Sequence, residues 1–204
     1  MGRSAPYIRA AVLLAVATVA TSNAGCQPSA TAGLPHYTAA DVQFMQGMIG
    51  HHAQAVTMAG WAPTHGARAD VQILAGRIVV SQRDEIASMQ RWLRDHHEMA
   101  PDANGHMTMD MGSGGHDALM PGMLTPEEMA QLDRARGPEF DKLFLAFMIH
   151  HHQGALTMVQ QLFGTQGAAQ DEVVFKFASD VGADQTAEID RMVTMLGTLQ
   201  SASQ

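Results

Sequence analysis

Two pairs of adjacent histidines, His51–His52 and His151–His152, are the side chains in this sequence best suited to metal chemistry. Neutral imidazole binds both copper and zinc readily. One buried histidine is ordinary in a protein core, but two adjacent ones in each half of the chain are costly to bury without a partner. The doublets therefore predict a metal site, or a related polar site, in the interior.

Carboxylates and thioethers recur near the histidines at helical spacing. A buried His–Glu pair could also satisfy itself by hydrogen bonding, and methionine is a common filler of irregular cores. Core packing is the preferred interpretation of four methionines on these stripes, Met58, Met89, Met158 and Met192. Beside the four histidines, the candidate metal ligands of the helical segments are Glu85, Glu188, Met48, Met148, Met58, Met158, Met89 and Met192.

Residues 96–124 form a different kind of segment, rich in glycine, methionine and histidine and without the periodic apolar pattern of a buried face. Methionines at the alternating positions 107, 109 and 111 cannot form a helical stripe. Because such a segment needs no core filler, its thioethers and imidazoles predict metal capture by a flexible loop. The candidate ligands of this loop are His96, His97, Met99, His106, Met107, Met109, Met111 and His116, followed by Met120 and Met123.

Copper is the metal that this set of ligands favours. Thioethers are soft and suit Cu(I), whereas imidazole accepts either Cu(I) or Cu(II). A di-iron carboxylate bundle would require Glu-x-x-His motifs, and neither Glu85 nor Glu188 has a histidine three residues later. Thiolate zinc sites are excluded because Cys26 is the only cysteine. Zinc or another divalent metal held by histidine and glutamate remains open.

An internal duplication organises the elements that carry these residues. The segment Asp41–Met58 (DVQFMQGMIGHHAQAVTM) recurs as Asp141–Met158 (DKLFLAFMIHHHQGALTM), with the doublet at the same place in both copies. The segment Gln82–Met89 recurs in the same order as Gln185–Met192. The additional histidine at position 150 has a glycine as its counterpart and is predicted to lie on the surface. Two matched blocks in one order indicate a real repeat.

Helices are the elements predicted for each block, because apolar and histidine positions recur at three- and four-residue spacing. Thr38 and Asp41 predict a capping box for the first helix, and Gly137-Pro138 predicts the start of its counterpart. A short helix is predicted to start at Thr125. Short breaks within each copy indicate antiparallel hairpins. The predicted fold is all-α, a ferritin-like four-helix bundle from two duplicated helical hairpins with a long Met/His-rich crossover.

Three motifs together resemble a known family. They are the repeated Met-Ile-x-His-His-x-x-Ala-x-x-Met block, the Gln-x-x-Glu-Ile-x-x-Met block, and the stretch Gly-Met-Leu-Thr-Pro-Glu-Glu-Met that precedes Phe140-Asp141. They resemble domain-of-unknown-function family three hundred and five, DUF305, over roughly residues 37–199. That family includes CopM-like copper-binding proteins and belongs to the ferritin-like superfamily. The resemblance implies an extracytoplasmic role in binding copper or another metal, with no settled enzymatic reaction.

The first residues of the chain predict export. Arg3 and Arg9 make the amino-terminal region positive, a short apolar run follows at residues 10–20, and small residues then lead up to Cys26. This pattern is typical of a secretory signal peptide, whereas a membrane-spanning helix needs about 20 apolar residues. Cys26 stands where a lipoprotein carries acyl chains, which would anchor the protein to a membrane. Ordinary cleavage after Ala24, which leaves a free thiol, is the alternative.

These features predict an exported protein of the periplasm or cell surface with one globular domain. The formal net charge of −8 disfavours nucleic acid as a partner, because an acidic surface repels phosphate. Metal ions and, through Cys26, a membrane are the predicted partners. The predicted segments are a signal peptide at 1–25, a flexible tether at 26–37 and a ferritin-like domain at 38–200, composed of a first hairpin at 38–95, the linker at 96–124 and a second hairpin with a leading short helix at 125–200.

The functional prediction is a binding module that sequesters copper or hands it over, and so limits copper toxicity. A ferritin-like metal-dependent oxidoreductase is the enzymatic alternative. Catalysis requires a rigid site with an open coordination position, and a flexible Met/His loop instead favours capture and exchange. A metal-free helical interaction domain, whose polar face binds another protein, is the third interpretation that stays open.

Overall fold

The structure, a computed structural model, describes residues 1–2, 36–106 and 119–201. By its contacts the chain divides into two units, Met1–Gly33 and Leu34–Gln204, and the described helices all belong to the second. Across the described ranges, no helix has the length and apolarity needed to cross a membrane. Several predictions lie outside the described residues, namely the signal peptide beyond Gly2, the tether up to residue 35, Cys26, Met107, Met109, Met111 and His116.

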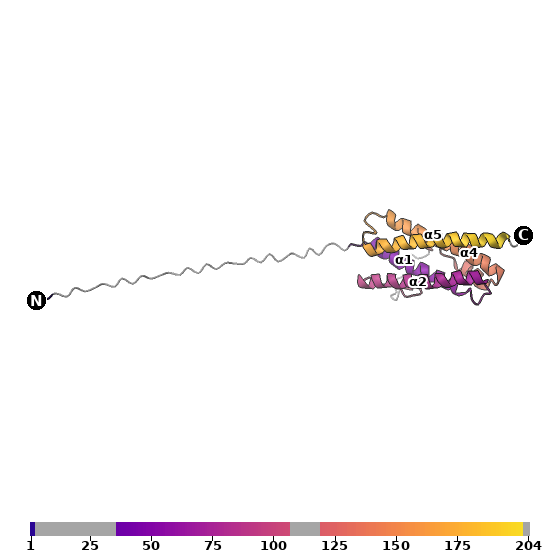
Figure 1. Ribbon diagram of the computed structural model, residues 1–204, viewed down its shortest axis with the longest axis horizontal. Helices are drawn as coiled ribbons and strands as arrows, with labels where there is room; N and C mark the ends of the chain where they lie inside the picture. The colour runs from indigo at the N-terminus through magenta and orange to yellow at the C-terminus, as the bar shows by residue number, and fades with distance from the viewer. Residues whose placement is uncertain (3–35, 107–118, 202–204) are drawn as a thin grey trace. The chain divides into compact units, whose positions relative to one another are not determined.

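Every regular element in the described ranges is a helix, which confirms the predicted all-α class. The repeated blocks of the sequence fall on matching helices in the two halves of the chain, and Figure 1 shows the long helices lying side by side as a bundle. The helices are α1 (Ala39–Gly60), α2 (Ala69–Asp95), α3 (Pro126–Arg134), α4 (Pro138–Gly164) and α5 (Glu172–Ser201).

The helix starts follow the local chemistry of the sequence. The Thr38 side chain accepts a hydrogen bond from the backbone N–H of Asp41, whose carboxylate accepts one from the Thr38 N–H at 2.7 Å. This confirms the predicted capping box of α1. A second capping box begins α3, the predicted short helix, at Thr125. Gly137 has a φ of 57°, a left-handed conformation that favours glycine, and Pro138 begins α4 as predicted.

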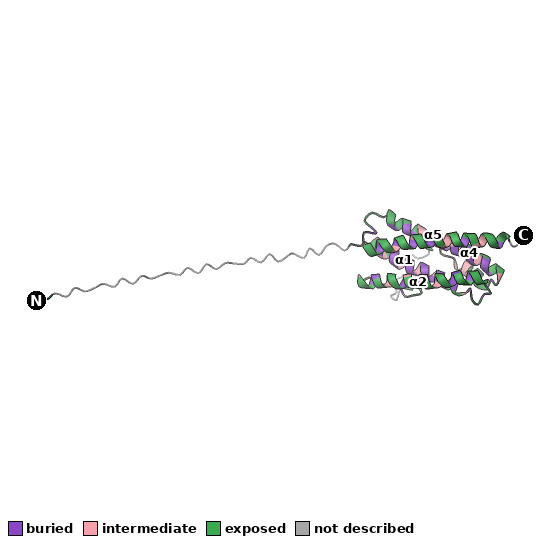
Figure 2. Ribbon diagram, in the orientation of Figure 1, coloured by how far each residue is buried: buried purple, intermediate pink, exposed green. Residues whose placement is uncertain are grey.

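The two hairpins meet through their first helices. Helix α1 packs on α2, α4 packs on α5, and α1 also packs on α4. The inner helices α1 and α4 each have more buried residues than α2 or α5, which Figure 2 shows largely in the green of exposed residues. The result is the predicted four-helix bundle with one long crossover, between α2 and α3. One apolar cluster contains Ile49 and Ala53, and a second contains Ala55 and Met58. The first histidine doublet therefore lies at the junction of two apolar clusters.

Each copy of the repeat ties the start of its inner helix to the other hairpin. Asp41 Oδ1 accepts a hydrogen bond from the backbone N–H of Ala169 at 2.6 Å, and Asp141 Oδ1 accepts one from the backbone N–H of Arg68 at 3.2 Å. Both aspartates are buried. Because Ala169 lies just beyond the end of α4, α1 and α4 run antiparallel. The sequence shows the repeated aspartate, but only the structure shows what it binds.

We expect Asp41→Ala to lower the free energy of unfolding by about 2–4 kcal/mol, because it removes the carboxylate half of the capping box of α1 and leaves the Ala169 N–H without its partner. Urea unfolding followed by circular dichroism measures the change. Asp70→Ala is the matched control, since Asp70 is exposed in the first turn of α2 and pairs with Arg68 at the surface. The control should lose less than about 1 kcal/mol. Equal losses in the two variants would contradict the role given to Asp41.

Candidate metal centre

The four histidines of the doublets meet where α1 packs against α4, and each is at most 1% exposed. The ring centroids of His51 and His151 lie 3.8 Å apart, with the ring planes tilted by 40°. Within each doublet the centroids are 6.5 Å apart for His51 and His52 and 6.3 Å apart for His151 and His152. The two halves of the repeat therefore contribute to one cluster, with His51 and His151 at its centre.

A carboxylate from the neighbouring helix holds each outer histidine. The Nε2–H of His52 donates to Glu85 Oε2 at 2.5 Å, and the Nε2–H of His152 donates to Glu188 Oε2 at 2.6 Å. With Nε2 carrying this hydrogen, Nδ1 is the ring nitrogen left to bind another group, and both Nδ1 atoms are buried without a hydrogen-bond partner in the described part of the chain. Each glutamate can therefore fix the tautomer and the orientation of its histidine ring.

The inner histidines also present unpartnered ring nitrogens. His51 donates its Nε2–H to the carbonyl oxygen of Pro121 at 3.0 Å. Its Nδ1, and Nε2 of His151, have no hydrogen-bond partner among the described residues, and nor do the side-chain oxygens of Gln82 and Gln185. A buried polar atom left unpaired costs about 1–3 kcal/mol. Several together indicate a group that the protein's own atoms do not supply, and imidazole lone pairs fit copper or zinc.

Burial keeps the inner rings neutral. It lowers the pKa of His51 to about 3, and the neighbouring His52 adds to the effect while the Pro121 carbonyl opposes it. Burial also lowers the pKa of His151 well below its ordinary value, and His51 contributes next. At pH 7 both rings are therefore in the neutral form that binds metal. Sequence reasoning had only the reference pKa of ~6.5 for these groups.

Residues 119–125, called the strap below, run across α1 and α4 at the end of the crossover. Gln54 of α1 holds the strap by donating to the Leu124 carbonyl at 3.0 Å and accepting from the Leu124 N–H at 2.8 Å. At Gly154 of α4 the strap backbone lies so close that any side chain would clash with it. This approach brings the Pro121 carbonyl to the cluster. Sequence reasoning missed the strap, although a glycine inside a helical block is a signal of close backbone approach.

The six helical methionines named as candidate ligands all lie in the apolar clusters. Met48, Met89 and Met158 belong to one cluster, and the others, Met58, Met148 and Met192, belong to the second. Their burial agrees with the core-packing interpretation, and a ligand role for any of them stays a prediction. His150 is exposed, as predicted.

The described loop residues do not form a ligand group of their own. His96 stacks on Trp92 with ring centroids 4.3 Å apart and donates its Nδ1–H to the Trp92 carbonyl at 2.8 Å. His97, Met99 and His106 are exposed. Within residues 36–106 and 119–201, no three His, Cys, Asp or Glu side chains are grouped closely enough to hold a metal ion. The role of the loop as a metal ligand therefore stays a prediction, and so does that of the four doublet histidines.

Known proteins share both the sequence pattern and the fold. The family model of the domain of unknown function DUF305 matches residues 41–196. A DUF305 protein from Streptomyces coelicolor, named as a candidate secreted protein, has 28% identity and a TM-score of 0.66 over 79% of this chain and 94% of its own. A DUF305 fragment from Deinococcus radiodurans has 29% identity and a TM-score of 0.66 over 79% and 98%. CopM in its Cu(II)-bound form has 28% identity and a TM-score of 0.59 over 78% and 96%. No curated protein matches the chain.

Proposed function

This chain belongs to the DUF305 family, and we propose that it binds copper outside the cytoplasm, where it sequesters the metal or hands it over and so limits copper toxicity. The observation that carries the proposal is the buried cluster of four histidines, in which ring nitrogens from both halves of the repeat have no protein partner. Such nitrogens are good ligands, and burying them unpaired is otherwise unfavourable.

Two observations favour copper over other metals. CopM has been solved in Cu(II)-bound and Cu(I)-bound forms, at 28% and 26% identity to this chain. The side chains of this chain agree with both oxidation states, because imidazole binds either one and the many thioethers prefer Cu(I). Zinc held by histidine is the competitor that an experiment must separate.

The proposed ligands are the ring nitrogens of His51, His52, His151 and His152. Glu85 and Glu188 were predicted from the sequence as ligands, and we now propose that they orient the outer rings, since each accepts the Nε2–H of its histidine. A copper ion at this position would be bound by two imidazole nitrogens from each half of the repeat. The two carboxylates also place negative charge beside the ion, which offsets part of the cost of burying a cation.

The Met/His loop at residues 96–124 is proposed as a second segment that captures metal. Its thioethers, which include Met99 and Met120 among the described residues, suit Cu(I) and exchange it readily. The buried imidazoles would hold an ion more firmly than the loop does. A rigid buried histidine site combined with a loop that exchanges metal favours storage or handover rather than catalytic turnover.

Export and anchoring remain proposals. The predicted signal peptide and Cys26 support them in the sequence, and the candidate secreted relative from Streptomyces coelicolor supports export. We propose that Cys26 carries the lipid that attaches the mature protein to a membrane. Mass spectrometry of the mature amino terminus decides between an acylated Cys26 and a free thiol.

Metal analysis of protein exported to the periplasm, followed by Cu(I) and Zn(II) competition titrations, tests the proposed function. We expect bound copper and preference for Cu(I) over zinc. A variant with five loop methionines replaced by leucine keeps the side-chain bulk but lacks the sulfur, so it should fold normally, keep Cu(II) binding at neutral pH and lose most of its loop-bound Cu(I). The five positions are Met107, Met109, Met111, Met120 and Met123.

Each alternative interpretation has its own outcome in this experiment. A folded protein that binds neither copper nor zinc would contradict the proposed function and favour a helical interaction domain. Turnover of an oxidisable substrate by the copper-loaded protein would favour an oxidoreductase. If the leucine variant holds Cu(I) as the parent does, the loop methionines are not ligands.

A further inference from the structure

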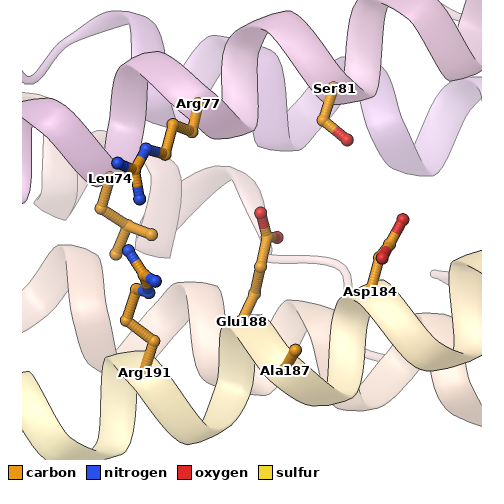
Figure 3. A pocket seen from close by; sticks show the side chains of 7 residues that line it. All are labelled: Leu74, Arg77, Ser81, Asp184, Ala187, Glu188 and Arg191. Carbon is orange, nitrogen blue, oxygen red and sulfur yellow. The ribbon is translucent and has the colours of Figure 1, made fainter.

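A groove separates α2 from α5 on the outer side of the bundle. Each of these helices packs mainly on its own hairpin partner. Two hollows of about 310 and 290 Å³ lie between them and share Ser81 and Asp184 as lining residues, so they form one continuous groove. Figure 3 shows the larger hollow, where Arg77 and Ser81 of α2 face Asp184, Glu188 and Arg191 of α5.

Two glutamates connect this groove to the buried histidine cluster. The side chain of Glu85 is 18% exposed and that of Glu188 is 23% exposed, and both line the groove. Their partners His52 and His152 are completely buried. Each glutamate therefore has one side in contact with solvent and the other in contact with an imidazole. Through these two glutamates, polar side chains connect the solvent in the groove with the buried histidine cluster.

The strap covers the cluster on another side. The Pro121 carbonyl accepts a hydrogen bond from the Nε2–H of His51. A Cβ on Gly122 would lie only 2.7 Å from the Gly154 Cα, and one on Gly105 would lie only 2.6 Å from the Gly50 Cα. Backbone thus rests directly on the helix backbone at both places. At these two contacts an ion would have to displace main chain, whereas in the groove it meets only side chains. A third hollow of about 270 Å³ lies beside the strap at Met120 and Pro121, but no charged side chain lines it, so nothing there attracts a cation.

The charge in the groove is uneven along its length. Asp184 lies between the two hollows, and burial raises its pKa, with Glu85, Asp180 and Glu188 adding to the rise. Asp180 is paired with Lys176, but Asp184 has no hydrogen bond or ion pair to another residue in the described part of the chain. Its negative charge is therefore not compensated by the protein, and a cation in the groove would be attracted to it.

The opposite end of the groove is positive. Arg77 and Arg191 extend toward each other beside Leu74, and Figure 3 shows Asp184 at the other end of the hollow. Neither arginine has an ion pair among the described residues. These guanidinium groups repel cations from their end, so the attraction is concentrated near Asp184.

We propose that copper ions reach the histidine cluster through the α2–α5 groove, and that Asp184 draws them into it without being a ligand of the final site. Glu85 and Glu188 line the same groove and bond to the outer rings of the cluster, so an ion attracted to Asp184 meets these two glutamates on its way to the rings. The inference rests on the proposed function, since it concerns how that same cluster is loaded.

Stopped-flow mixing of metal-free protein with Cu(II) chloride, followed by the fluorescence of Trp61 and Trp92, tests this path. At low ionic strength we expect Asp184→Asn to slow association about threefold and Arg191→Gln to speed it by a similar factor, because charge at a binding groove changes the local ion concentration. Both effects should shrink in about 0.5 M salt, where charges are screened over a few ångströms. The number of copper ions bound at the end should not change.

The matched controls remove the same charges outside the groove. Asp190→Asn and Arg83→Gln alter exposed residues of α5 and α2 that do not line either hollow, and they should leave the rate close to the parent's. With Cu(II) nitrilotriacetate, an anionic complex, the order of the two groove variants should reverse. Equal rates for groove and control variants, or a lower final stoichiometry in Asp184→Asn, would overturn the inference. Failure of the parent to bind copper at all would instead overturn the proposed function.

Discussion

Replacing His51 and His52 together with glutamine should abolish tight copper binding, and replacing His151 and His152 should have the same effect. The sequence alone left two possibilities open, separate sites in each half of the repeat or one shared site. The 3.8 Å contact between the rings of His51 and His151 favours the shared site. If both doublets supply ligands to one ion, as proposed, affinity should fall more than about 100-fold in both variants.

Glutamine is preferred to alanine in these variants because all four side chains are buried, and alanine would leave cavities that destabilise the fold. His150→Gln is the matched control, since this histidine is adjacent in sequence but exposed on α4. Competition titration with a copper chelator measures the affinities, and circular dichroism verifies folding. If each doublet variant retained half of the copper at the parent's affinity, the two halves would bind independently and the shared site would be wrong.

The stability of the metal-free protein should fall steeply in mild acid. The pKa of His51 is lowered to about 3 and that of His151 is also lowered well below its ordinary value, whereas in the unfolded chain both are near ~6.5. Between these values the unfolded chain binds more protons than the folded one, so the free energy of unfolding decreases as the pH falls. His51 alone should lower the free energy of unfolding by about 2 kcal/mol between pH 7 and pH 5, and His151 should lower it further.

Urea unfolding at pH 7, 6 and 5 in the presence of a chelator measures this loss. His51→Gln/His151→Gln should flatten the profile, because glutamine is uncharged at every pH. His150→Gln should leave the slope as it is in the parent, since this ring is exposed. If the free energy of unfolding of the double variant depended on pH as strongly as that of the parent, these two rings would not remain neutral on folding.

Much of the fold follows from local sequence. The duplicated blocks, the three- and four-residue spacing and the capping box at Thr38 predict helices whose starts the structure confirms. These signals act between residues a few positions apart, so they can be read without knowing the tertiary structure. The same is true of the burial of both doublets, because every histidine of a doublet lies beside the apolar stripe of its own helix.

The partners of the site residues depend on the antiparallel packing of α1 on α4. Nothing in the local pattern of His51 identifies His151 as its neighbour, and nothing near Asp41 identifies the Ala169 N–H. These contacts join residues a hundred or more positions apart. The repeat makes the symmetry of the two halves evident, but symmetry alone does not show whether matching residues meet or remain separate.

The sequence by itself therefore determined that this protein has two matched helical hairpins, each burying a histidine doublet beside a glutamate. Only the tertiary structure decided that the doublets form one cluster, that Glu85 and Glu188 bond to the outer rings, and that a strap places the Pro121 carbonyl on His51. The reason is physical. Helix periodicity is a short-range property, whereas hydrogen bonds, burial and the resulting pKa values depend on which distant surfaces pack together.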